Sequence, residues 1–151
     1  VDMNEYLGFR SPQLFIKAIT LSRSEENSVR IADERLEMLV SGKNYENSDV
    51  DVPDLSDFRS VFRYLRREAG SDGKAVSLIS AVRILENEFE IPVTLCKLKI
   101  ILEVLKEQNL LSAEYNGDRN TVFLKMIPSS GKINIDDSPL LSKIRESARK
   151  E

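Results

Sequence analysis

The apolar and polar positions of this chain follow two different periods, which predict strands in some places and helices in others. Residues 13–17 alternate with a period of two, as in a half-buried strand, after a turn-rich segment broken by Gly8 and Pro12. Residues 29–40 instead place apolar side chains three, four and seven apart, which predicts a helix that Gly42 can end.

A clear helical period continues through the middle of the chain and predicts three more helices. Asp54 or Ser56 can cap the first, Pro92 ends the second, and Thr94 caps the third, which runs to Asn109. The three apolar stripes are Phe58, Val61, Phe62 and Leu65; Leu78, Ile79, Val82, Leu85 and Phe89; and Leu95, Leu98, Ile101, Leu102 and Leu105. Each stripe covers one helix face, as in a helix packed on a core.

A β-hairpin is expected after the third of these helices. Its strands would cover residues 110–115 and 121–127, joined by Asn116–Asn120, whose Asn-Gly pair is typical of hairpins. A last helix is expected to begin near Ser138, with Pro139 in its first turn, where a missing N–H costs nothing. Three helices followed by a hairpin is the winged-helix order, so the predicted fold class is α+β.

Changes in polarity indicate how the chain is divided. Residues 43–53 are polar and aperiodic, which predicts a linker and a domain boundary near Pro53. Residues 22–53 would then be a helix and polar linker, and residues 54–151 a winged-helix-like domain with its C-terminal helix. Residues 71–74 are expected to be a loop between the first two helices of that domain.

The strand at residues 13–17 needs neighbours for its backbone hydrogen bonds, and no earlier segment can supply them. We therefore expect the chain to be the C-terminal part of a larger protein. Its role would then depend partly on the rest of that protein.

The chain has 151 residues and contains no histidine. The length suits one ordinary domain, or one domain plus a remnant of another. The lack of histidine excludes Ser-His-Asp triads, imidazole acid–base catalysis and histidine-containing metal sites. No phosphate-binding glycine loop and no calcium-loop spacing occurs either. We expect no catalytic residue, no metal ligand and no cofactor in this chain.

The cysteine content indicates the cellular compartment, and the charge distribution indicates which kinds of partner the chain could bind. The single cysteine, Cys96, rules out an internal disulfide and favours the cytoplasm, and its apolar neighbours predict a buried side chain. No apolar run approaches the roughly 20 residues that span a bilayer, so no membrane partner is expected. The net charge is −3, but residues 1–54 hold 6 basic and 11 acidic side chains, against 16 and 14 in residues 55–151. This asymmetry permits a basic patch in the second part.

Two blocks of the sequence resemble the C-terminal half of RecJ of the clostridial or Firmicute type, the single-strand-specific 5′→3′ exonuclease of bacterial DNA repair and recombination. The first block, Asn4-Glu5-Tyr6-x-Gly8 through Pro12-Gln13-Leu14, is similar to a late strand of the OB domain, with Tyr6 in place of the usual tryptophan. The second block contains Asp57-Phe58-Arg59-Ser60-Val61, Lys97-Leu98-Lys99, Asn109-Leu110-Leu111 and Lys132-Ile133-Asn134-Ile135-Asp136.

The resemblance implies that residues 1–21 are the end of an OB domain, so that an OB-fold remnant strand precedes the winged-helix-like domain. It also implies that the catalytic core, whose Asp and His ligands bind Mn²⁺ or Mg²⁺, lies outside this chain. The implied role of the chain is non-catalytic. It would position single-stranded DNA beside the upstream catalytic core, or recruit a repair helicase or a single-strand-binding protein.

The main candidate DNA contacts are Arg59, Arg63, Arg66 and Arg67. Their spacing places them on one face of the predicted helix, opposite its apolar stripe. Arginine forks pair with phosphate oxygens, although such a face can also be merely solvated, with its arginines paired to acids such as Glu68. In the OB remnant, Tyr6 and Arg10 are candidates for base stacking and phosphate contact, or else side chains that decorate a turn.

The third predicted helix carries mixed charge, which argues against reading the major groove. Lys99 and Glu103 are four residues apart and are expected to pair with each other, and acids on this helix would repel phosphate. The turn Asn116–Asn120 carries one Arg and one Asp and is expected to be only a turn. Two alternatives therefore stay open: a protein-docking module without DNA contact, and an independent winged-helix regulator, which would need a dimer.

Overall fold

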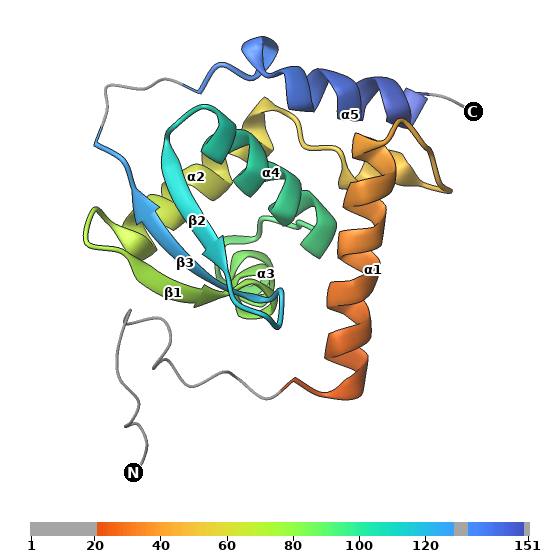
Figure 1. The fold of residues 1–151 in the computed structure, drawn as a ribbon. Coiled ribbons are helices and arrows are strands. Elements are labelled where there is room, and N and C mark those ends of the chain that lie inside the picture. The colour runs from red at the N-terminus through yellow and green to blue at the C-terminus, as the bar shows by residue number, and fades with distance from the viewer. Residues whose placement is uncertain (1–20, 129–132, 150–151) are drawn as a thin grey trace.

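A computed structural model describes residues 21–128 and 133–149 of the chain. Figure 1 shows helices packed around a small antiparallel sheet, so the fold is α+β, as predicted. The elements are α1 (Arg23–Val40), η2 (Ser48–Asp51), α2 (Leu55–Ala69), β1 (Lys74–Ser77), α3 (Leu78–Phe89), α4 (Leu95–Glu107), β2 (Leu111–Tyr115), β3 (Thr121–Met126), η3 (Ile135–Asp137) and α5 (Pro139–Arg149). The predicted strand at residues 13–17, with Tyr6 and Arg10, lies outside the described residues.

Helix α1 begins at Arg23 rather than at the predicted Val29, because a capping box makes the polar segment helical. The Ser22 hydroxyl accepts the backbone N–H of Glu25 at 3.2 Å, and the Glu25 carboxylate accepts the N–H of Ser22 at 2.9 Å. Two N–H groups that the first turn leaves unpaired are thereby satisfied. The helix ends before Gly42, whose φ of 85° lies in the left-handed region.

The three helices predicted for the middle of the chain are confirmed, as are the predicted caps Asp54 and Thr94, while the cap Ser77 was not predicted. Asp54 and Asp57 form a second capping box at the start of α2, with N···O distances of 2.8 and 3.0 Å. Gly70 ends α2 with a φ of 62°. Ser77 and Thr94 cap α3 and α4 through their hydroxyl groups.

Strand β1 is not predicted by the sequence pattern. The expected loop is present at residues 71–73, but Lys74, its predicted last residue, begins the strand. Strand β1 pairs antiparallel with β3, Lys74 lying opposite Leu124, and β2 pairs with the other edge of β3. The sheet order is therefore β1-β3-β2. With only Ala75 and Val76 apolar, the segment is too short to show a period of two, and its conformation depends on pairing with β3.

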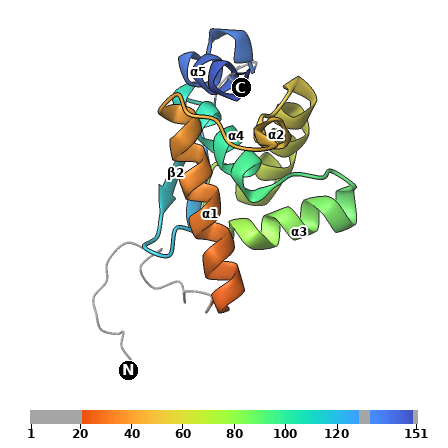
Figure 2. The same cartoon turned by 90° about the vertical axis from the view of Figure 1, so that its right-hand side faces the viewer.

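Helix α4 lies at the centre of the core, and α1, α2, α3 and α5 all pack against it (Figures 1 and 2). Leu39 of α1, Phe58 of α2, Leu98 of α4 and Leu141 of α5 are fully buried in one cluster. Helix α1 thus shares a core with the segment that follows Pro53. The domain boundary near Pro53 stays a prediction.

Residues 43–53 contain the short helix η2, which differs from the structureless linker that was expected. This helix packs against α4 and α5. Its residues Ser48 and Asp51 are buried, which a polar, aperiodic sequence does not suggest. The segment is ordered by hydrogen bonds rather than by an apolar stripe.

The hairpin at Asn116 is confirmed, but its loop is longer than the two-residue turn that an Asn-Gly pair favours. The N–H of Arg119 donates to the carbonyl of Asn116 at 3.0 Å, and the left-handed residue is Arg119, with a φ of 60°. The Asp118 carboxylate accepts two backbone N–H groups that follow it, each at 2.9 Å. The carboxylate, rather than Gly117, therefore sets the shape of the loop.

The buried residue Asn120 attaches this loop to the start of α3. Its side-chain oxygen accepts the N–H of Ile79 at 2.9 Å, and its amide nitrogen donates to the Ser77 hydroxyl at 3.0 Å. Its backbone carbonyl accepts the N–H of Leu78 at 2.9 Å. Three polar groups at the N-terminus of α3 are satisfied in this way, which fixes α3 against the hairpin.

Two glycine-to-alanine substitutions test this backbone geometry. Gly73 has a φ of 90°, and a Cβ there would lie 2.7 Å from Cζ of Phe123, so Gly73→Ala is expected to lower the free energy of unfolding by about 1–3 kcal/mol. Gly117 has no left-handed φ and open space around it, so Gly117→Ala should leave stability unchanged or raise it by up to about 1 kcal/mol. Urea denaturation of both variants checks this, and equal losses would contradict the described turns.

Candidate functional site

Helix α2 presents the arginines proposed from the sequence on its exposed face. Its inward residues Phe58, Val61 and Leu65 are fully buried against the core. The exposed cationic side chains are Arg59, Arg63, Arg66 and Arg67, as the helical period predicts. We call these four residues the arginine face.

None of the four guanidinium groups forms an ion pair with any residue that the structure describes. Glu68, the expected partner, instead pairs with Lys74 at 3.3 Å. Arg66 lies over the Phe62 ring at 5.4 Å, and Arg67 lies over the Phe89 ring at 4.9 Å. The arginine face is therefore held partly by aromatic contacts, and no carboxylate among residues 21–128 and 133–149 neutralises its positive charge.

Helix α4, the helix that a winged-helix protein would place on DNA, offers almost no free surface. Eight of its residues are buried, and only Lys106 and Glu107 at its end are exposed. Lys97 pairs with Asp57 at 3.2 Å, with both side chains mostly covered. The prediction that this helix does not read the major groove agrees with this burial.

Lys99 on α4 is fully buried and does not pair with Glu103, which corrects the expected intrahelical pair. Its ammonium donates to the Asp33 carboxylate of α1 at 2.6 Å and to the Arg119 carbonyl of the hairpin at 2.9 Å. Burial lowers the pKa of Lys99, while the hydrogen bond and charge of Asp33 act in the opposite direction. The ammonium therefore joins three elements that are far apart in the sequence.

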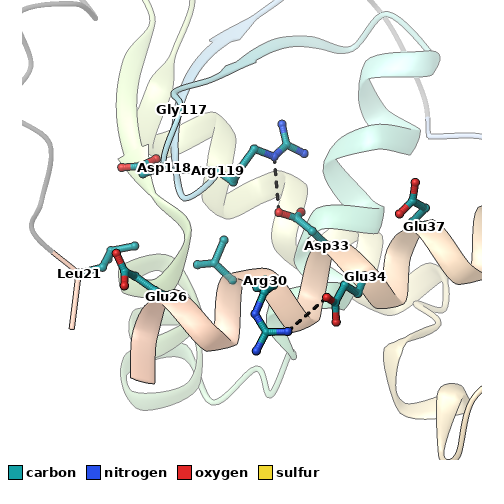
Figure 3. A pocket seen from close by; sticks show the side chains of 10 residues that line it. Leu21, Glu26, Arg30, Asp33, Glu34, Glu37, Gly117, Asp118 and Arg119 are labelled. Carbon is teal, nitrogen blue, oxygen red and sulfur yellow. Dashed lines mark hydrogen bonds and ion pairs between the residues drawn. The ribbon is translucent and has the colours of Figure 1, made fainter. Parts of the chain in front are cut away.

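Arg119 also contacts Asp33, so the hairpin loop, which was expected to be only a turn, binds to α1. Its Nε lies 3.5 Å from the second carboxylate oxygen of Asp33, and its guanidinium lies 4.3 Å above the Tyr115 ring. Figure 3 shows Asp33 on α1 facing Arg119 across a groove. We call Asp33, Lys99 and Arg119 the α1 latch.

The groove between α1 and the hairpin has a volume of about 440 Å³ and an acidic lining. Its carboxylates are Glu26, Asp33, Glu34, Glu37 and Asp118, against two arginines, Arg30 and Arg119. Burial alone would raise the pKa of Asp118, but backbone N–H groups of Thr121 and Asn120 donate to it and hold the pKa below its usual value. This groove repels phosphate.

A second buried polar network surrounds Asp51 of η2. The carboxylate accepts the Tyr45 hydroxyl at 2.7 Å and the Thr94 hydroxyl at 2.5 Å, and Arg35 lies 3.8 Å away. Burial and the bond to Asp51 raise the pKa of Tyr45, so its hydroxyl stays protonated. Burial and the charge of Asp51 raise the pKa of Cys96 to about 12, so the thiol is a buried, unreactive group, as expected.

In the part of the chain that the structure describes, no three acidic or thiol side chains lie close enough together to hold a metal ion. Within residues 21–128 and 133–149, no helix combines the length and apolar composition that a membrane crossing requires. Comparison with known proteins finds no matching family model, no similar curated protein and no similar solved structure.

The α1 latch predicts that replacing Asp33 lowers the stability of the protein more than replacing Lys99. Asp33→Asn leaves the fully buried Lys99 ammonium without a carboxylate, and should lower the free energy of unfolding by about 3–5 kcal/mol. Lys99→Met removes the buried charge itself, and the Asp33 carboxylate still pairs with Arg119 and is partly exposed to water. The loss of stability in Lys99→Met should therefore be smaller. Chemical denaturation at neutral pH compares them, and an equal or larger loss for Lys99→Met would contradict the latch.

The Tyr45–Asp51 contact predicts a dependence of stability on alkaline pH. The folded pKa of Tyr45 is raised above its ordinary value of 10.0, so its contribution is complete below about pH 10 and is lost as the pH rises further. The slope from this one group is at most about 1.4 kcal/mol per pH unit. Tyr45→Phe should therefore make the fall in stability between about pH 10 and 11 less steep. Unfolding curves at each pH measure this, and an unchanged slope would contradict the burial of Tyr45.

Proposed function

We propose that this chain is a non-catalytic, winged-helix-like module that holds single-stranded DNA on the arginine face of α2. The observation that carries the proposal is the set of four exposed arginines without a carboxylate partner among the described residues. Two pairs, Arg59 with Arg63 and Arg63 with Arg67, are four residues apart and repel each other within the helix. A row of phosphates relieves that repulsion and forms charge-assisted hydrogen bonds.

The order of elements supports the winged-helix part of the proposal. From α2 to β3 the chain runs helix, strand, helix, helix, strand, strand, with β3 between β1 and β2. The burial of α4 and the acidic groove beside the hairpin argue against reading of duplex DNA. Contact with a phosphate backbone through α2 needs neither of those surfaces.

The resemblance to RecJ-type exonucleases gives this module a setting. We propose that it is the C-terminal part of such an enzyme, following an OB-domain remnant at residues 1–21, and that metal-dependent phosphodiester hydrolysis belongs to the upstream core. In this arrangement the module positions the strand beside that core, in the cytoplasm, and has no nuclease activity alone. Tyr6 and Arg10 remain candidate contacts on the OB side.

A second function is favoured by the acidic groove between α1 and the hairpin. The groove of about 440 Å³ has five carboxylates, of which Asp33 and Glu34 already pair with basic side chains of this chain. The remaining negative charge suits a basic segment of a partner protein, such as a repair helicase or a single-strand-binding protein. In this alternative the chain is a docking module and the arginine face is merely solvated. The two functions differ in whether the chain binds DNA.

The test is binding of the full chain to a labelled single-stranded oligonucleotide by fluorescence anisotropy. Arg63→Glu reverses a charge at the centre of the arginine face, and should weaken binding by about tenfold or more, or about 1.4 kcal/mol. The matched control is Arg30→Glu, which reverses another exposed arginine, on α1, that already pairs with Glu34. The control should change the affinity by less than about twofold.

Salt dependence separates the outcomes of this test. Binding through phosphates must weaken steeply as salt rises from about 50 to about 200 mM, and Arg63→Glu should reduce that slope. No binding at low salt would overturn the proposal and favour the docking module. Equal losses for Arg63→Glu and Arg30→Glu would show that DNA does not select the arginine face.

A further inference from the structure

We propose that a pocket between α2 and the end of α3 receives one unstacked base of the bound strand. This inference rests on the proposed function, because the arginine face must first hold the backbone. The pocket has a volume of about 220 Å³ and is lined by Ser60, Arg63, Tyr64, Arg67, Phe89 and Ile91. We call it the α2–α3 pocket.

The wall of this pocket consists of planar groups in contact with one another. The Phe89 ring meets the Tyr64 ring edge-on, with centroids 5.7 Å apart and an interplanar angle of 68°. On Phe89 lies the guanidinium of Arg67, at 4.9 Å from the ring centroid. Tyr64 is 6% exposed and cannot easily turn away. A base can stack on the planar guanidinium that covers Phe89, as bases do on arginine planes and aromatic rings.

The end of α3 holds Phe89 and Ile91 in place on the other side. Glu90 ends the helix in the left-handed conformation, with φ 55° and ψ 36°. The N–H of Ile91 then donates to the carbonyl of Leu85 at 2.8 Å, which closes the turn. This turn fixes the backbone that carries Phe89 and Ile91, which reduces the entropy cost of ordering that side of the pocket on binding.

The size and chemistry of the pocket fit a single nucleotide unit. Its volume lies below the roughly 300–1,000 Å³ of sites for larger small molecules, so one planar ring system suits it. Ser60 and Tyr64 carry hydroxyl groups that can donate to or accept from base edges. Burial raises the pKa of Tyr64, so its phenol keeps the proton that it would donate.

The pocket is continuous with the arginine face, because Arg63 and Arg67 belong to both. A phosphate held by Arg63 places the adjoining base next to the guanidinium of Arg67. An acidic peptide could use the same arginines, but its side chains lack the planar face that the Arg67–Phe89 stack accommodates. A nucleic-acid base is therefore the occupant that the lining favours.

The test compares an abasic oligonucleotide of about ten units with the same oligonucleotide carrying one central thymine, a length within the usual single-strand site sizes. For the full wild-type chain, the single thymine should tighten binding about fivefold or more. Phe89→Leu and Arg67→Lys should each remove most of that gain, since each breaks the planar stack while conserving charge. Phe123→Leu, a half-buried aromatic on β3 outside the pocket, is the control and should retain the gain. Circular dichroism and thermal melting verify that each variant is folded.

Three outcomes would overturn the inference, and they differ from failure of the proposed function. If the abasic strand binds in a salt-sensitive way but thymine adds nothing, the pocket takes no base, while the arginine face still binds DNA. If the gain survives in both Phe89→Leu and Arg67→Lys, the base binds elsewhere. If a phosphorylated peptide binds more tightly and loses affinity in Phe89→Leu, the occupant is a peptide. If no strand binds at all, the proposed function itself fails.

Discussion

The rest of this structure depends on one buried ion pair, between the ammonium of Lys99 and the carboxylate of Asp33. Removing an ammonium from water costs several kcal/mol, and only close contacts such as those to Asp33 and the Arg119 carbonyl offset that cost. These partners come from α1 and the hairpin, while Lys99 comes from α4. The charge is satisfied when α1 packs along α4 with the hairpin beside them, so the ion pair favours that arrangement.

That arrangement decides which surfaces can act. With α1 against it, α4 has little free surface, and the groove beside the hairpin carries five carboxylates. A negatively charged backbone is repelled there, so duplex reading in the usual winged-helix manner is disfavoured. Helix α2 lies on another side of the core, and we propose its arginines, which pair with no carboxylate of the described residues, as the phosphate-binding surface. In our proposal, the arginine face contacts the phosphate backbone and the α2–α3 pocket next to it holds a base.

Local signals in the sequence predicted the helices well, because caps such as Asp54 and Thr94 and breakers such as Gly42 act within one turn. The arginine face followed from helical spacing in the same way. Strand β1 could not be predicted, since its conformation comes from pairing with a strand nearly fifty residues later. The partner of Lys99 was also missed, because Glu103 is nearer in sequence while Asp33 is near only after folding. The one signal in the sequence for a buried charge was the position of Lys99 between the apolar residues Leu98 and Ile100.

The most direct test of the account is to locate the bound strand by photocrosslinking. A single-stranded oligonucleotide with 5-iododeoxyuridine is irradiated with the full chain, and the modified peptides are identified by mass spectrometry. The account predicts adducts within residues 59–67 of α2 and around Phe89 at the end of α3. Adducts concentrated on the hairpin loop at residues 116–120, or on the exposed end of α4, would contradict it.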